Sequence, residues 1–139
     1  ILNNQPLPIY GLGKNSREWI HVFDHCEALL KLFNKGKIGE SYNVGSNQNL
    51  TNINIAKKIL FIAKKKSIKI GKNTKIKFVK DRPGQVSRHI SSTEKAHRLL
   101  GWTAKIDLDD GLQQTVEFYK NNKQWWEKFL WMKELWGQK

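Results

Sequence analysis

The chain has 139 residues, of which 39% are hydrophobic and 11% aromatic, so its composition is that of one folded domain rather than of a disordered segment. No run of 18 apolar residues is present, which argues against a membrane span, and the single cysteine, Cys26, cannot form an internal disulfide, as is usual in the cytoplasm. The formal net charge of +13 comes almost entirely from scattered lysines, with only four arginines, and favours a solvated surface over a nucleic-acid site.

The first 36 residues predict two short strands and one helix. Residues 7–10 are expected to form a strand that ends at a Gly-rich turn, and residues 17–22 alternate as a second strand would. Asp24 is expected to cap a helix, because its carboxylate can accept from the free amides of the first turn. The helix should end at Gly36 in a left-handed conformation. Its apolar face, expected to be buried, consists of Ala28, Leu29, Leu32 and Phe33.

The middle of the chain predicts two more strands around a second helix. Ser41–Val44 is expected to form a brief strand, and Thr51 to cap a helix that ends at Lys64–Lys66, where positive charge suits the helix dipole. After a turn at 71–73, the alternation in Lys75–Val79 predicts a strand with one apolar face. The apolar face of the helix consists of Ile55, Ile59, Leu60 and Ala63.

Only helices are predicted in the last third of the chain. Ser91 and Glu94 have the spacing of a capping box for a short helix that Gly101 closes. Asp107 or Asp109 is expected to cap the next helix. The residues that this helix should bury are Leu112, Val116 and Tyr119.

The tail from Lys123 is expected to be helical and is rich in tryptophan. It either packs on the domain as core or faces another domain, a subunit or a membrane surface. Its large apolar residues are Trp125, Trp126, Phe129, Leu130 and Trp136. Taken together, residues 1–139 predict one small α/β lobe with few short strands, about five helices and no complete Rossmann domain.

Three patterns carry the residues of a cofactor or metal site in the wrong context. Gly11–Gly13 lacks the third glycine of a dinucleotide fingerprint, and no amphipathic helix follows it. Tyr10–Lys14 and Tyr119–Lys123 match the catalytic Tyr-x-x-x-Lys pair of short-chain dehydrogenases, but the first spans a turn and nothing places the second beside a nicotinamide. His21 precedes the helix of His25, so the two do not form a metal-binding pair. We therefore predict no catalytic, cofactor-binding or metal-ligating residue.

The arginines suggest a phosphate site. Arginine presents a planar fork of donors that fits phosphate oxygens. Arg17 follows the Gly-rich turn and Arg82 precedes Pro-Gly, so both stand at rigid positions in a chain that otherwise uses lysine. Tyr10 lies near enough in the sequence to stack on a base. Against the alternative of surface salt bridges, this combination favours a diphosphate site.

Five motifs, taken in order, resemble those of one enzyme family. They are Pro-Leu-Pro-Ile-Tyr-Gly at 6–11, Arg-Glu-Trp at 17–19, Asp-His at 24–25, Tyr-Asn-Val-Gly at 42–45 and Val-Lys-Asp-Arg-Pro-Gly at 79–84. Nearly the whole chain is similar to the C-terminal, substrate-binding part of the dTDP-glucose 4,6-dehydratases, which are extended short-chain dehydrogenases. The resemblance implies a lobe that binds a nucleotide diphosphate sugar within an NAD-dependent lyase, for which a homodimer is one assembly.

The resemblance also implies site residues. Pro8 and Tyr10 match positions that line the thymine and the nucleoside. Arg17 and Arg82 match positions that bind the diphosphate, and Asn52 matches an asparagine that contacts the nucleotide.

Four positions depart from the family pattern. Gln85, which we include among the substrate-binding residues, stands where the family has a histidine beside the nucleotide. Glu18 replaces an aspartate, Leu12 replaces an acidic residue, and His89 stands where a tyrosine is usual. These departures leave the base and the sugar open.

The family's chemistry depends on residues that this sequence lacks. Its members oxidise the sugar at C4 with bound NAD, eliminate water across C5–C6 and return the hydride, using an N-terminal Rossmann domain. The chain is therefore expected to bind substrate and to be inactive alone, as a fragment or as one half of a split enzyme. A nucleotide-sugar epimerase and a stand-alone basic module for nucleic acid or a protein partner remain the alternatives.

Overall fold

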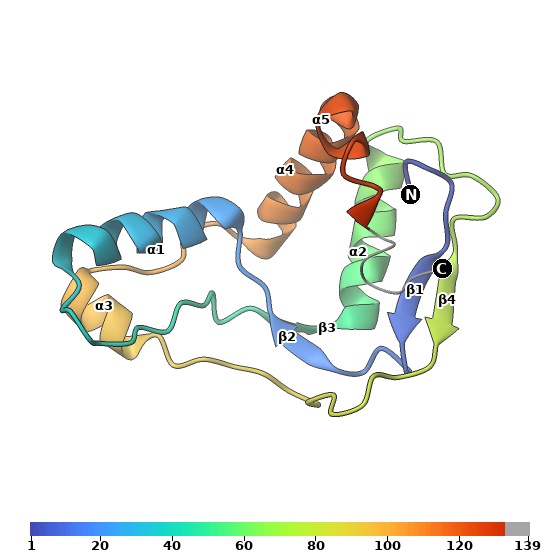
Figure 1. The fold of residues 1–139 in the computed structure, drawn as a ribbon. Coiled ribbons are helices and arrows are strands. Elements are labelled where there is room, and N and C mark those ends of the chain that lie inside the picture. Colours follow the sequence, from blue (N-terminus) through green and yellow to red (C-terminus); the bar gives the residue numbers. More distant parts are fainter. Residues whose placement is uncertain (133–139) are drawn as a thin grey trace.

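A computed structural model of the chain describes residues 1–132. Their elements, in order, are β1 (Leu7–Tyr10), β2 (Ser16–Glu18), α1 (Val22–Lys35), β3 (Asn49–Thr51), α2 (Asn52–Lys65), β4 (Ile76–Val79), α3 (Glu94–Leu100), α4 (Leu108–Asn121) and α5 (Lys123–Glu127). Figure 1 shows β1, β4 and α2 at one end of the molecule, α1 and α3 at the other, and β2 with β3 between them. Short strands mixed with five helices among these residues confirm the predicted α/β class.

Two small sheets join segments that are distant in the sequence. β1 and β4 run parallel, with Ile9 opposite Phe78, and β2 and β3 run antiparallel, with Arg17 opposite Leu50. Gly13 lets α2 approach β1: a Cβ there would lie 2.6 Å from Cγ2 of Ile9 and 3.0 Å from Cβ of Ile53, and its φ of +68° suits glycine. The predicted strand at 17–22 is too long, because the extended chain leaves the sheet after Glu18 and α1 begins at Val22.

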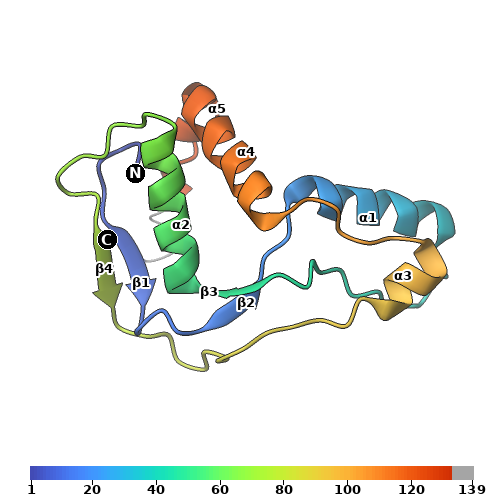
Figure 2. The same ribbon diagram turned by 180° about the vertical axis from the view of Figure 1, so that it is seen from behind.

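The buried apolar residues form one group around α2 and another around α1 and α3, and Figure 2 shows these helices at opposite ends of the molecule. At the α2 end the buried apolar residues are Ile9, Ile55, Ala56, Ile62 and Ala63. At the α1 and α3 end they are Ala28, Ala96, Leu100 and Trp102. The predicted helical spacing of α2 is thus confirmed at Ile55 and Ala63, since burying one apolar stripe is what stabilises such a helix.

Asp24 is not the cap of α1, as the sequence suggested. The N-cap is His21, whose Nδ1 accepts a hydrogen bond from the Phe23 N–H. Asp24 lies within the first turn, is only 2% exposed, and accepts from the main-chain N–H groups of Lys105 and Ile106, both at 3.0 Å. The carboxylate therefore joins the helix to a segment that only the tertiary fold brings near.

Two further expectations about α1 were wrong. Gly36 does end the helix, but with φ −66° and ψ 143° it is extended rather than left-handed. Of the predicted apolar face, Ala28 is buried and Leu32 packs beside it, whereas Leu29 is 51% and Phe33 is 86% exposed. The outer side of α1 is thus an uncovered apolar surface.

Ser41–Val44 does not form the predicted strand. The segment carries no assigned strand, although Tyr42 and Val44 pack against the Trp102 core. Within the described residues, no main-chain hydrogen bond joins Ser41–Gly45 to another segment. The residue pattern suits a strand, but a strand also needs a partner.

The helix ends of the last third agree only in part with expectation. Ser91 does not cap α3; its N–H donates to Glu18, and Thr93 is the N-cap without a side-chain hydrogen bond. Gly101 closes α3 in the left-handed conformation, and Asp107 caps α4, as predicted.

The exposure of the C-terminal aromatics was predicted less well. Tyr119 is 45% exposed rather than buried. Trp125 and Phe129 are also exposed, and the helix α5 of the tail covers Lys123–Glu127. Trp136 lies outside the described residues.

Candidate functional site

The parallel pairing of β1 with β4 brings the loops that follow them together. Parallel strands end at the same edge of a sheet. The Gly11 N–H donates to the Val79 carbonyl at 2.9 Å, and Asn15 Nδ2 donates to the Val86 carbonyl at 3.2 Å. The Ser16 N–H then donates to the carbonyl of Ser87 at 2.9 Å. The Gly-rich turn therefore lies beside the 80–87 loop, which holds Arg82 and Gln85.

Arg17 is anchored to this loop. Its Nη1 donates to the carbonyl oxygens of Ser16 at 2.7 Å and Val86 at 2.9 Å, and its Nη2 donates to Oε1 of Gln85 at 3.0 Å. Arg17 and Gln85 are both partly buried. Two residues predicted separately from the sequence are thus in direct contact.

Arg82 meets Tyr10 in the same region. The guanidinium carbon lies 4.0 Å from the centre of the Tyr10 ring, a cation–π distance. Because side chains alternate along a strand, Pro8 shares the sheet face of Tyr10, and the register places Lys77 and Val79 beside them. Pro8 is exposed, so this face can be reached by a ligand.

Asn52 is linked to the site through its main chain. Its N–H donates to the Asn15 carbonyl, and the Ile53 N–H donates to the Gly13 carbonyl. The Thr51 hydroxyl accepts from the Asn54 N–H, as the cap prediction required. Since these amides of the first turn of α2 already have protein partners, the helix N-terminus is not itself an anion site.

Glu18 and Asn15 are site-forming residues that sequence reasoning missed. The Glu18 carboxylate accepts from the N–H groups of Asn47 at 2.5 Å and Ser91 at 3.0 Å, so it joins two loops to the strand of Arg17. Asn15 joins α2 to the 80–87 loop. In the sequence, Glu18 stands out only as a departure from the family motif. The only sequence signal for Asn15 is that it is a polar residue shortly after the Gly-rich turn.

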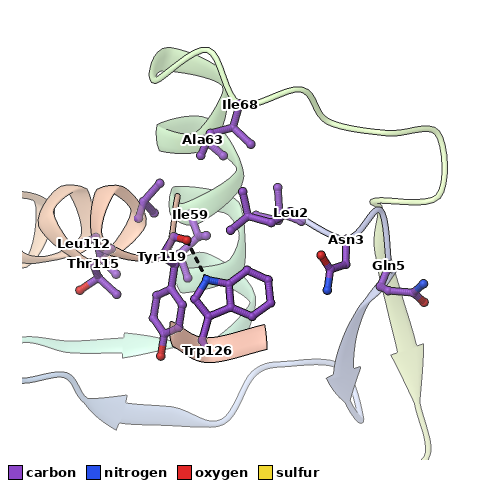
Figure 3. Close-up of a pocket in the computed structure, with 12 residues that line it drawn as sticks. Leu2, Asn3, Gln5, Ile59, Ala63, Ile68, Leu112, Thr115, Tyr119 and Trp126 are labelled. Atoms are coloured by element: carbon purple, nitrogen blue, oxygen red, sulfur yellow. Dashed lines mark hydrogen bonds between the residues drawn. The ribbon is translucent and has the colours of Figure 1, made fainter. Parts of the chain in front are cut away.

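Arg82 thus belongs to the 80–87 loop and Arg17 contacts it, while an apolar pocket lies elsewhere. This pocket, of about 370 Å³, is enclosed by α2, α4, Trp126 and the first residues of the chain. Figure 3 shows Tyr119 and Trp126 beside each other in it, with Trp126 Nε1 donating to the Tyr119 carbonyl at 2.8 Å. None of the six predicted site residues lines it, and its walls are almost wholly apolar, so we place the site on the loop surface.

The Gly11–Gly13 turn does not have the geometry of a dinucleotide-binding fingerprint. A Cβ at Gly13 would meet Ile9 and Ile53, and a Cβ at Gly11 would meet the Asp81 carboxylate. The space beside both glycines is thus taken by protein atoms, which leaves no room there for a pyrophosphate. The segment after Gly13 enters β2 rather than a helix. Within residues 1–132 no three His, Cys, Asp or Glu side chains are grouped as metal ligands, and no helix has the length and apolarity to cross a bilayer.

Comparisons with known proteins agree on one group of enzymes. The family model described as GDP-mannose 4,6 dehydratase matches residues 1–115. The probable dTDP-glucose 4,6-dehydratase of Sinorhizobium fredii is 39% identical over 127 residues, which are 91% of this chain and 36% of that protein. The chain therefore spans about a third of the length of the curated relatives that it matches.

Solved structures give the same result. The dTDP-glucose 4,6-dehydratase of Streptomyces venezuelae, solved with NAD bound, superposes with a TM-score of 0.80 at 33% identity and covers 91% of this chain and 38% of its own. A UDP-glucuronic acid 4-epimerase from Bacillus cereus, solved with UDP-glucuronic acid and NAD, has a TM-score of 0.73 at 25% identity and covers 86% of this chain and 37% of its own.

Proposed function

The chain belongs to the family described as GDP-mannose 4,6 dehydratase, and on that premise we propose that residues 1–139 are the nucleotide-sugar-binding portion of an NAD-dependent 4,6-dehydratase. The substrate class is a dTDP-hexose such as dTDP-glucose, after the relatives of that name. The residues that form its binding site are Pro8, Tyr10, Arg17, Asn52, Arg82 and Gln85. The portion forms one unit in a cytoplasmic enzyme, a homodimer in its full assembly, and has no activity by itself.

One observation carries this proposal: Arg17 and Arg82 meet the same short loop although they come from different parts of the chain. Arg17 donates hydrogen bonds to Gln85 and Val86. Arg82, which precedes Gln85 by three positions in the same loop, stacks on the ring of Tyr10. A diphosphate needs two cationic donors placed side by side, and a base needs an aromatic or flat apolar surface next to them. Pro8 and Tyr10 on one sheet face supply that surface.

NAD is then bound by a Rossmann domain outside these residues, and the α1 end of the molecule is the surface that meets it. Phe33, Leu30 and Phe23 are exposed along α1, and grouped exposed apolar side chains of this kind mark interaction surfaces. Beside α1, Ser41–Gly45 is extended and has no strand partner among the described residues. A strand of that domain paired with Ser41–Gly45 would supply its missing main-chain partner beside α1.

An epimerase that acts on a nucleotide sugar is the second candidate. It is favoured by the structural similarity to the UDP-glucuronic acid 4-epimerase. The two candidates differ in the base that is bound, since Tyr10 and Pro8 would face thymine in one and uracil in the other.

The deciding experiment is calorimetric titration of the chain with dTDP, UDP and GDP at physiological salt. We expect saturable binding of dTDP that weakens at least tenfold in Arg17→Ala and in Arg82→Ala, because each loses a charged hydrogen-bond donor. Arg98→Ala is the matched control, since Arg98 is exposed on α3, away from the loop. Tighter binding of UDP than of dTDP would favour the epimerase.

A random DNA duplex belongs in the same series. Salt-sensitive duplex binding without any nucleotide binding would contradict the proposal and favour a basic nucleic-acid module.

A further inference from the structure

The donors of Arg17 are unequally used. Guanidinium has five N–H donors. Nη1 has two hydrogens and donates to two main-chain carbonyls, those of Ser16 and Val86, so neither is available to a ligand. One of those two hydrogens faces Nη2, and the end-on pair formed by Nη1 and Nη2 is therefore closed.

The opposite edge of the same group is open. Nη2 donates one hydrogen to Oε1 of Gln85. Among the described residues, no hydrogen-bond partner contacts the second hydrogen of Nη2 or the Nε–H of Arg17. Since Val86, the chain neighbour of Gln85, binds Nη1, we assign Gln85 to the Nη2 hydrogen that faces Nη1. The remaining Nη2 hydrogen then points to the same side as the Nε–H, and the two form the side-on fork that fits two oxygens of a phosphate group.

Gln85 is a neutral partner for this cation. A carboxylate at this distance would pair with the guanidinium and cancel its charge, and an imidazolium would repel it. The amide oxygen of Gln85 accepts one hydrogen and carries no charge that would offset the charge of Arg17.

We propose that Gln85 is a positioning residue, which with Val86 orients Arg17 so that its Nε–Nη2 edge faces the diphosphate. This inference rests on the proposed function and assigns Gln85 an action through Arg17 in place of a direct ligand contact. It predicts that replacing Gln85 changes the Kd for the nucleotide only when Arg17 is present.

A double-mutant cycle in the full chain tests this, with dTDP as the titrant. Gln85→Ala should raise the Kd about tenfold, the size of one hydrogen bond to a charged group. In an Arg17→Ala background the same change should alter the Kd less than about twofold, since coupled residues are not additive. An equal, tenfold loss in both backgrounds would mean that Gln85 contacts the ligand itself and would overturn the proposal. Gln114→Ala, an exposed glutamine on α4, is the matched control and should leave the Kd unchanged.

Gln85→His adds a readout that a purely structural role would not move. Neutral histidine can accept from Arg17, but protonated histidine cannot. The ratio of the variant's Kd to that of the wild type should rise as the pH falls through about 6.5. The pH range from 5.5 to 8 brackets the ordinary histidine pKa of about 6.5. A ratio that stays constant over this range would contradict the proposal.

Nitrogen NMR of the guanidinium separates failure of this inference from failure of the proposed function. Slow rotation of the Arg17 Nη groups in the free wild-type chain, lost in Gln85→Ala, supports the restraint without any ligand. If the restraint is seen and no nucleotide binds, the proposed function is overturned and the restraint stands. Rapidly averaged Nη signals in the wild type overturn the inference whatever binds.

Discussion

The guanidinium of Arg82 stacks on Tyr10, with 4.0 Å between its central carbon and the centre of the ring. The contact joins the end of β1 to the loop after β4 and keeps a cation beside the sheet face of Pro8. At an exposed site such stacking contributes about 0.5–1 kcal/mol. Its larger effect is to hold the side chain where a phosphate can reach it.

The first prediction concerns this ring. Tyr10→Leu should weaken dTDP binding by about tenfold or more, because it removes both the support of Arg82 and a stacking surface worth about 1–3 kcal/mol per base. Tyr10→Phe, which keeps the ring, should stay much nearer the wild type. Calorimetry gives both constants, and equal losses in the two variants would show that the hydroxyl rather than the ring matters.

The second prediction concerns the buried carboxylate of Asp24. Asp24→Ala should lower the free energy of unfolding by about 3 kcal/mol, because two main-chain donors, those of Lys105 and Ile106, lose a charged acceptor. Asp24→Asn keeps one acceptor oxygen and should lose about half as much. Urea denaturation measures both.

Asp110→Ala is the control for Asp24. Asp110 is exposed in the first turn of α4, and its removal should cost less than about 1 kcal/mol through the helix dipole. A loss at Asp24 no greater than this would show that the carboxylate does not hold the 102–106 segment.

The third prediction is a pH dependence. Lys95 Nζ lies 2.6 Å from Oε2 of Glu40, and its hydrogen bond and charge hold the pKa of the Glu40 carboxyl below the ordinary 4.5. A carboxyl with a lowered folded pKa contributes stability that is fully present above the unfolded value and is lost as the pH falls through the folded one. The difference in Tm between wild type and Glu40→Gln should therefore be present at pH 7 and disappear in acid.

Salt is the internal control for this pair, because the side chains are solvent-accessible. At about 1 M salt the Tm difference at pH 7 should shrink, since the Debye length falls to about 3 Å. A difference that persists unchanged at low pH would mean that Glu40 acts by packing rather than by charge.

The fourth prediction concerns the apolar face of α1. Phe33→Glu should change the free energy of unfolding by less than about 0.5 kcal/mol, since Phe33 is 86% exposed. If α1 docks on the proposed Rossmann domain, the change should nevertheless abolish co-purification with the remaining portion of the Sinorhizobium fredii relative. Phe61→Glu is the control: Phe61 is 68% exposed on α2, at the other end of the molecule in Figure 1. Docking through α1 would be contradicted if both variants still co-purified with that portion, or if neither did.

Much of the local structure could be predicted from the sequence. The strand at Leu7–Tyr10, the caps Thr51 and Asp107, and the left-handed Gly101 all follow from residues within one turn of each other. The family could be predicted as well, because its motifs stand in order along the chain and need no structure to be read.

What only the tertiary structure decided are the contacts between distant segments. Arg17 and Gln85 are 68 positions apart, and Asp24 is 81 positions from Lys105, so neither pairing has a local signal. The sequence pattern at Ser41–Val44 favours a strand, yet hydrogen bonding to a neighbour decides whether one forms. By itself, the sequence determined which segments can be helices or strands and to which family the chain belongs. Packing decided which faces are covered and how Arg17 is oriented, because both depend on what lies across the fold.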